Sequence, residues 1–146
     1  MTLDNLLGMS LERIDADPLA IQRLLEAAQR NIADAQVEAI SNENRFDAAY
    51  KAIMQMANTA LQTNGYRTLS SKPGHHQTMI QTLPKTIGLD TEIMIVLDAL
   101  RKQRNAADYS GDLVADSAVA ECIDQAKLLW MKVSEWLNHE HPELLK

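Results

Sequence analysis

Residues 46–65 read FDAAYKAIMQMANTALQTNG and contain the most regular apolar pattern in the chain. Apolar side chains recur there at three- and four-residue spacing, which predicts an amphipathic helix with a wide apolar face. Asn64-Gly65 is a typical helix stop. Several of the apolar residues are alanines, whose small side chains allow a neighbouring helix to approach closely. This stretch therefore favours a fold of closely packed helices.

Similar segments lie on both sides of this helix. Asp17-Pro18 is an N-cap followed by proline at the first helical position, and Asp90 or Thr91 is a second candidate cap. Pro84 is expected to end a short helix, and Ser110-Gly111-Asp112 is expected to end a long one. The segments expected to be helical are 18–40, 46–63, 75–83, 90–110 and 118–138.

These segments are joined by brief connections and show no alternating strand pattern, so the expected fold class is all-α. We predict an antiparallel up-and-down bundle of four long helices plus one short helix, formed by residues 18–138. Residues 1–17 are an N-terminal segment and are expected to be at most a frayed helix. Residues 139–146 are expected to form a frayed C-terminal tail.

The composition agrees with packed helices. Of the 146 residues, 46% are apolar but only 4% are aromatic. The single cysteine, Cys122, falls at an apolar position and is expected to be a small core residue. No run of about 18 apolar residues and no secretion signal are found, so we expect a cytoplasmic protein that does not enter a membrane.

The net charge of −6 argues against a strongly basic nucleic-acid binder, but the charges are unevenly distributed. Residues 48–89 contain no carboxylate. They contain four cations and two histidines: Lys51, Arg67, Lys72, Lys85, His75 and His76. A positive surface is expected if the helix ending near Arg104 packs beside this stretch. The open alternative is that the cations point in different directions.

A second polar concentration is the stretch LRKQRNAADYSGD, residues 100–112, at the end of one predicted helix. Arg104 and Asp108 are four residues apart, so an ion pair can orient the guanidinium. Asn105 and Tyr109 have the same spacing on the adjoining face. The candidate binding residues in this stretch are Arg101, Lys102, Arg104, Asn105, Asp108 and Tyr109.

Other kinds of site are not indicated. No Glu-x-x-His pair of a di-metal helical bundle is present, and His75 and His76, being adjacent, are expected to diverge on a helix. No serine nucleophile elbow or glycine-rich phosphate loop is found either. We therefore expect no metal and no cofactor.

Three pieces of the chain, in this order, resemble the HEPN family. They are the helix of residues 46–65, the histidine-bearing loop Gly74-His75-His76, and LRKQRNAADY at residues 100–109. The resemblance covers about residues 18–137. It implies a small helical bundle, commonly a homodimer, that binds nucleotides or RNA. It also implies a possible partner, because HEPN proteins often accompany a minimal nucleotidyltransferase in toxin–antitoxin-like pairs.

Many HEPN proteins are metal-independent ribonucleases that use an arginine, a following polar residue and a histidine four to six positions further on. Arg104 and Asn105 match the first two. Asp108 and Tyr109 stand where the histidine would fall, and the next histidine is His139. A tyrosine with a pKa of about 10 and an arginine-paired aspartate are poorly suited to proton transfer at neutral pH. The resemblance therefore implies binding of RNA or a nucleotide without ribonuclease activity.

Two alternatives remain open at this point. His76, on the loop, could contact the same ligand and replace the missing histidine if it approaches Arg104. The second alternative is a protein-interaction bundle in which the Arg104–Asp108 pair is structural, and in which the N-terminal apolar segment and Trp136 form a dimer or partner surface. For Tyr109 itself, the alternative to a binding role is a phenol that closes the helix end onto the bundle and hydrogen-bonds a neighbour.

Overall fold

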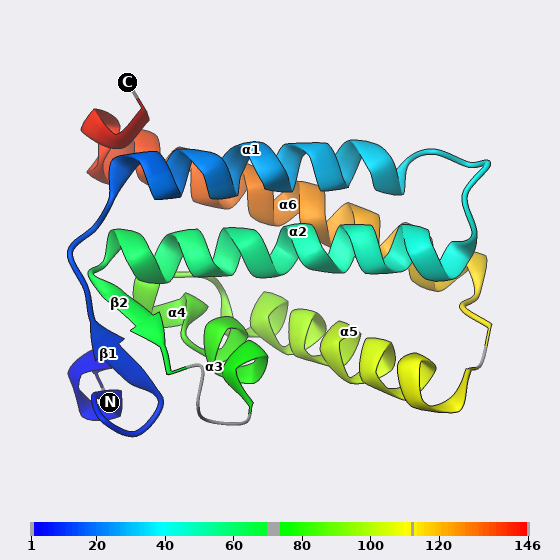
Figure 1. Cartoon of the computed structure of the whole chain (residues 1–146), viewed down its shortest axis with the longest axis horizontal. Helices are drawn as coiled ribbons and strands as arrows, with labels where there is room; N and C mark the ends of the chain where they lie inside the picture. The colour runs from blue at the N-terminus through cyan, green and yellow to red at the C-terminus, as the bar shows by residue number, and fades with distance from the viewer. Residues whose placement is uncertain (1, 70–73, 112, 146) are drawn as a thin grey trace.

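Four long helices form an all-α bundle in the computed structural model, which describes residues 2–69, 74–111 and 113–145 (Figure 1). They are α1 (Pro18–Ala35), α2 (Asn42–Thr63), α5 (Thr91–Ser110) and α6 (Asp116–Glu140). Each of them runs antiparallel to the one before it, so the predicted up-and-down bundle is confirmed. Two short helices, α3 (His75–Gln81) and α4 (Leu83–Thr86), connect α2 to α5.

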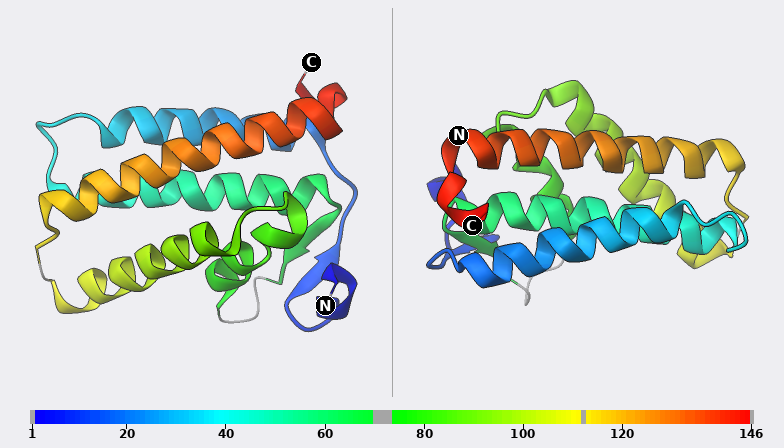
Figure 2. Two further views of the ribbon diagram at one scale, coloured as in Figure 1. Left: turned by 180° about the vertical axis from the view of Figure 1, so that it is seen from behind. Right: turned by 90° about the horizontal axis from the view of Figure 1, so that it is seen from above.

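Helix α2 is the centre of the bundle. It lies between α1 and α5, and α6 crosses behind the α1–α2 pair (Figures 1 and 2). It contacts every other α-helix in the described chain. Twelve of its side chains are buried, including Ala49, Ala52, Ala57 and Ala60, and these alanines allow the close helix contacts that the sequence indicated. In α5, by contrast, only Leu97 and Leu100 are buried.

Several helix ends differ from the predicted ones. Helix α2 begins at Asn42 instead of residue 46, because the Ser41 side chain caps it by accepting from the Asn44 N–H at 3.3 Å. Helix α1 ends at Ala35 instead of residue 40, because Arg45 Nε donates to the Ala35 carbonyl at 2.8 Å and satisfies the helix end from outside. The short helix after Gly74 ends at Gln81, and Pro84 then lies in the first turn of α4 instead of stopping a helix. Proline is tolerated there because its missing N–H has no partner in a first turn.

The N-terminal segment is not a frayed helix, and it contributes one strand to a two-stranded sheet that the sequence pattern did not indicate. After a 3₁₀ turn, η1 (Leu3–Leu6), strand β1 (Leu11–Arg13) pairs antiparallel with β2 (Tyr66–Thr68). Leu11, Leu61 and Tyr66 form a buried cluster, here called the β1–β2 cluster, that is separate from the main core. Three-residue strands paired across more than fifty positions leave too short a pattern to be detected from the sequence.

The C-terminal tail is also ordered, contrary to expectation. Helix α6 continues to Glu140, and η2 (Pro142–Leu145) folds back on α1. Leu144 is buried, and its carbonyl accepts a hydrogen bond from Gln22 Nε2 at 3.1 Å. The Trp136 and His141 rings lie 5.2 Å apart. Burial of one leucine and one carbonyl therefore anchors the end of the chain.

Cys122 is fully buried in the main core, as predicted. Its S–H lies 3.8 Å from the Phe46 carbonyl, and burial raises the pKa of its thiol to about 12. No helix within the described ranges is both long and apolar enough to span a bilayer.

Candidate functional site

Arg104 lies near the end of α5, on the side that faces α2. Its Nε is 3.3 Å from Asp108 one turn further along α5, which confirms the predicted ion pair. The same nitrogen donates to Asp47 of α2, also at 3.3 Å. The side chain of Arg104 is 29% exposed. Two carboxylates from two helices therefore hold the guanidinium in place.

The outer end of the Arg104 guanidinium is available to a ligand. Both ion pairs reach it through Nε, and the two terminal amino groups make no hydrogen bond to a described residue. Those amino groups carry four N–H donors in a planar fork. The face of the guanidinium lies over the Tyr50 ring, with Cζ 5.3 Å from the ring centroid. Such a held fork suits a phosphate or carboxylate ligand.

His76 approaches the same place from α3. The helix begins at His75, after Gly74 takes a left-handed conformation (φ 79°) that redirects the chain. Tyr50 Oη and His76 Nδ1 are 3.2 Å apart. The two histidine rings meet edge to face with centroids 4.7 Å apart, so the expectation that they diverge was wrong. They do not diverge because they stand at the first turn, directly over the α2 surface.

The protonation states of Tyr50 and His76 follow from their surroundings. Burial raises the pKa of Tyr50 to about 12, against the opposing effect of Arg104 and Arg101. The pKa of His76 is lowered by burial first and by the positive charges of His75, Arg104 and Arg101 second. At neutral pH the phenol is therefore protonated and the imidazole is neutral. Tyr50 Oη and His76 Nδ1 therefore share one hydrogen, and in the Nε2–H tautomer of His76 the phenol is the donor.

These groups line a cavity of about 260 Å³, here called the Arg104 pocket. One stripe of α2 forms its floor, at spacings of three and four residues that place all of its members on one helix face. The α2 residues are Asp47, Tyr50, Lys51, Met54, Gln55 and Asn58, and the remaining residues are His75, His76, Met79 and Arg104. Lys51 and Arg104 are the cations of the lining, and Asp47 is its carboxylate. With Asp108, which also pairs with Arg104, the charges at the pocket balance.

The positive surface expected from residues 48–89 is only partly formed. Lys51, His75 and His76 reach the Arg104 pocket. Arg67 instead forms an ion pair with Glu12 across the small sheet, and Lys85 lies in the last turn of α4. Lys72 lies outside the described residues, as does Asp112 of the predicted helix stop; the stop itself is Gly111 in a left-handed conformation.

The other predicted binding residues lie outside the Arg104 pocket. Arg101 is held by Asp98 at 2.8 Å, and Lys102 approaches the same carboxylate at 3.7 Å. Asn105 is half-buried and does not line the pocket. Tyr109 is 93% exposed and makes no hydrogen bond to a described residue, so the expectation that it closes the helix end onto the bundle was wrong. The structure thus brings together Arg104, with its partner Asp108, and His76.

The residues that sequence reasoning missed all lie on α2 and α3. Asp47, Lys51, Gln55 and Asn58 are polar positions at helical spacing beside the apolar stripe, and that spacing could have identified them as one lining. Tyr50 was correctly predicted as part of the apolar face. Its second role, as hydrogen-bond partner of His76, depends on how α3 folds over α2.

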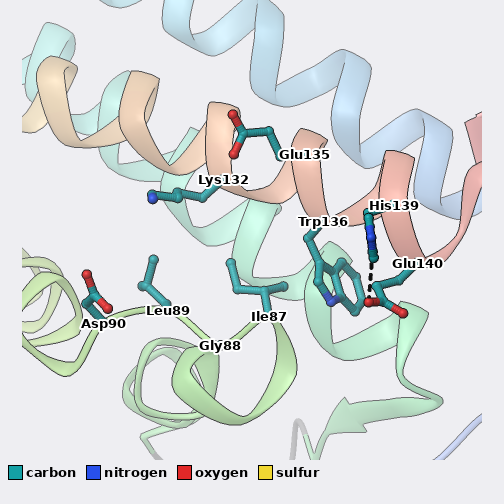
Figure 3. Close-up of a pocket in the computed structure, with 9 residues that line it drawn as sticks. All are labelled: Ile87, Gly88, Leu89, Asp90, Lys132, Glu135, Trp136, His139 and Glu140. Carbon is teal, nitrogen blue, oxygen red and sulfur yellow. Dashed lines mark hydrogen bonds and ion pairs between the residues drawn. The ribbon is translucent and has the colours of Figure 1, made fainter.

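A second, larger cavity of about 430 Å³ lies between α6 and the loop that follows α4 (Figure 3). We call it the α6 pocket. Trp136 faces Ile87 across it, and His139 pairs with Glu140 at its rim at 3.0 Å. Among the residues that the structure describes, no group of three or more His, Cys, Asp or Glu side chains is placed to hold a metal ion.

Comparison of the chain with protein-family models, with curated proteins and with solved structures finds no match.

Proposed function

We propose that this chain is a HEPN-like helical module that binds the phosphate of a nucleotide or of RNA in the Arg104 pocket. The observation that carries the proposal is the convergence of Arg104 and His76, from separate helices, on one pocket. The terminal amino groups of Arg104 would hold the phosphate oxygens through charge-assisted hydrogen bonds. His76 Nε2–H and Lys51 would supply further donors from the opposite wall.

The same geometry favours binding over cleavage. A histidine that serves as general base must present an unprotonated nitrogen to the ribose hydroxyl. We propose that Nδ1 of His76, 3.2 Å from the Tyr50 hydroxyl, accepts its hydrogen bond, and that Nε2 carries the proton. The nitrogen left for a ligand is therefore a donor. His76 approaches Arg104, as it must if it is to replace the missing histidine. Its Nε2–H tautomer, however, suits phosphate binding.

The surroundings of the pocket allow a ligand longer than one nucleotide. A neighbouring hollow on α1 and α2 shares Lys51 and Gln55 with the Arg104 pocket and adds Arg30. A strand of RNA that places one phosphate at Arg104 can continue past Lys51 toward Arg30. This line of three cations supports RNA as the extended ligand, in spite of the overall charge of −6.

Binding of a short fluorescent RNA at low salt, followed by anisotropy, tests the proposal. Arg104→Ala should weaken binding at least tenfold, because a hydrogen bond to a charged group contributes about 1.5–3 kcal/mol. Arg23→Ala, at an exposed position of α1, is the matched control and should bind like the wild type. Undetectable binding by the wild type, or equal binding by both variants, would overturn the proposal. Incubation with structured RNA in a chelator checks for cleavage.

The second candidate function is a protein-interaction bundle that acts as a homodimer or with a minimal nucleotidyltransferase. Exposed apolar side chains on and after α5 favour it, namely Ile95 at 58% and Leu113 at 90% exposure. A second chain seated there would lie on the same helix as Arg104. Light scattering should then show an assembly that Ile95→Lys dissociates. A strictly monomeric protein that also fails to bind the transferase would contradict this function.

A further inference from the structure

The end of the Arg104 pocket away from the arginine is built from two carboxamide side chains, Gln55 and Asn58 of α2. Each has its oxygen engaged by another side chain. Asn31 Nδ2 of α1 donates to Gln55 Oε1 at 2.9 Å, and Gln62 Nε2 donates to Asn58 Oδ1 at 3.2 Å. These contacts orient the two amides. The amino groups of Gln55 and Asn58 are therefore what this end of the pocket offers to a ligand.

From this arrangement we infer that the pocket selects nucleotides with a keto base, guanine or uracil, over those with an amino base, adenine or cytosine. The inference depends on the proposed function, because it takes the phosphate of the same nucleotide to lie at Arg104. Beyond that function, it states that the pocket recognises the base of the nucleotide, and it states which bases the pocket prefers.

The spacing along α2 suits one nucleotide. Tyr50, which lies beneath the Arg104 guanidinium, and Asn58 are eight residues apart on one helix, a rise of roughly 12 Å. Gln55 lies between them. A phosphate at Arg104 therefore places the attached sugar over Lys51 and the base near the two amides.

Two methionines form the apolar part of the wall in this region. Met54 of α2 is 7% exposed, and Met79 of α3 is half-buried on the opposite side. A thioether is polarisable and packs well against an aromatic ring. A flat base can therefore rest against Met54 and Met79 while its edge faces the amides of Gln55 and Asn58.

The chemistry of the base edges then determines the preference. Guanine presents two acceptors, O6 and N7, on one edge, and uracil presents the acceptor O4 in the corresponding place. Adenine carries an amino group in place of O6, although it keeps the acceptor N7, and cytosine carries an amino group in place of O4. Against the N–H groups of the half-buried Gln55 and Asn58, an amino group places donor against donor and leaves these N–H groups without an acceptor. Guanine and uracil instead satisfy them.

Calorimetric titration of the full chain with GMP, AMP, UMP and CMP tests this inference, with ribose 5-phosphate as the ligand that has no base. We expect GMP to bind about tenfold more tightly than AMP, and UMP about tenfold more tightly than CMP. Ribose 5-phosphate should bind more weakly than GMP and should be as sensitive to Arg104→Ala.

Two variants replace a donor group of the pocket by an acceptor. Gln55→Glu and Asn58→Asp keep the oxygen that Asn31 or Gln62 contacts, so the fold should persist, and replace the amino group by an acceptor. Each should lower the GMP-to-AMP affinity ratio several-fold. Gln103→Glu adds the same charge on the exposed side of α5 and should leave that ratio unchanged.

The outcomes separate the two proposals. Equal affinity for all four nucleotides, with binding still lost in Arg104→Ala, would overturn the keto-base preference and leave the phosphate site standing. A GMP-to-AMP ratio unchanged by Gln55→Glu and Asn58→Asp would also overturn the preference. Failure of every nucleotide to bind, or binding indifferent to Arg104→Ala, would overturn the proposed function and this inference together.

Discussion

The Arg104 pocket and the α6 pocket differ in how their polar groups are held. The α6 pocket is the larger, at about 430 Å³ against 260 Å³, and its charges are of both signs. Its histidine, His139, has a side chain that is 84% exposed and pairs with the adjacent Glu140. In the Arg104 pocket, the floor is the most buried helix of the bundle, and the polar groups are oriented by neighbours. Orientation of donors toward one space distinguishes a binding site better than size does.

The largest difference should appear in stability. Tyr50 is 2% exposed and forms the pocket floor, whereas Trp136 is half-buried at the edge of the α6 pocket. Tyr50→Ala should lower the free energy of unfolding by about 3–5 kcal/mol because it opens a cavity in the core. Trp136→Ala should cost about half as much, since much of its ring remains in contact with water. Urea unfolding measures both. Equal losses of unfolding free energy would mean that Tyr50 and Trp136 contribute equally to stability, which would contradict the comparison of the two pockets.

A smaller effect is expected when only the phenol oxygen is removed. Tyr50→Phe deletes the donor to His76 Nδ1 and should lower the free energy of unfolding by about 1 kcal/mol. Without this donor, the His76 ring should no longer favour the Nε2–H tautomer. Its nitrogen-15 chemical shifts should then change from those of the Nε2–H form to those of a mixture of the two tautomers. Tyr109→Phe is the matched control, because that phenol is 93% exposed. An unchanged His76 spectrum in Tyr50→Phe would refute the tautomer assignment.

The effect of single exposed cations on RNA binding should be smaller again. Lys51→Ala should weaken binding a few-fold and reduce the slope of log affinity against log salt by about 0.7, the value for one phosphate contact on a single strand. Lys132→Ala removes a cation from the α6 pocket and should leave both quantities unchanged. Equal effects of the two substitutions would indicate diffuse attraction instead of a phosphate site.

The smallest effect should be the pH dependence of stability that His76 causes. Its pKa is below the ordinary value of 6.5 in the folded chain, so the unfolded chain binds the proton more readily. Stability is therefore complete above pH 6.5 and declines as the pH falls from 6.5 toward the folded pKa. His76→Gln should remove this part of the decline between pH 7.5 and 5.5 in urea unfolding. His139→Gln, in the α6 pocket, should retain it.

Most of the fold could be predicted because the helices are encoded locally. Apolar spacing, the Asp17-Pro18 start and the Gly111 stop each act within one or two helical turns, and the structure has helices at these places. The end of α1 could not be placed, since it depends on Arg45 of the next helix reaching back to the Ala35 carbonyl. The β1–β2 pair depends in the same way on residues far apart in sequence.

In the candidate site, too, contacts within one helix were predictable and contacts between helices were not. The Arg104–Asp108 pair follows from a spacing of four on one helix and was predictable. The contact of Arg104 with Asp47 and the approach of His76 to Tyr50 join different helices, so spacing alone could not predict them. The resemblance to the HEPN family indicated that the pieces belong together, without indicating which side chains touch.

The β1–β2 cluster also affects how the chain unfolds locally. Leu11, Leu61 and Tyr66 form a core of their own, separate from the bundle core. We therefore expect β1 to detach while the four long helices remain folded. The amide hydrogen of Ile14, which donates to the Gly65 carbonyl at 2.9 Å, should exchange well before those in the middle of α2. Because Leu61 belongs to α2 and Met79 of the Arg104 pocket packs against this cluster, each such opening loosens one wall of the pocket without unfolding its floor.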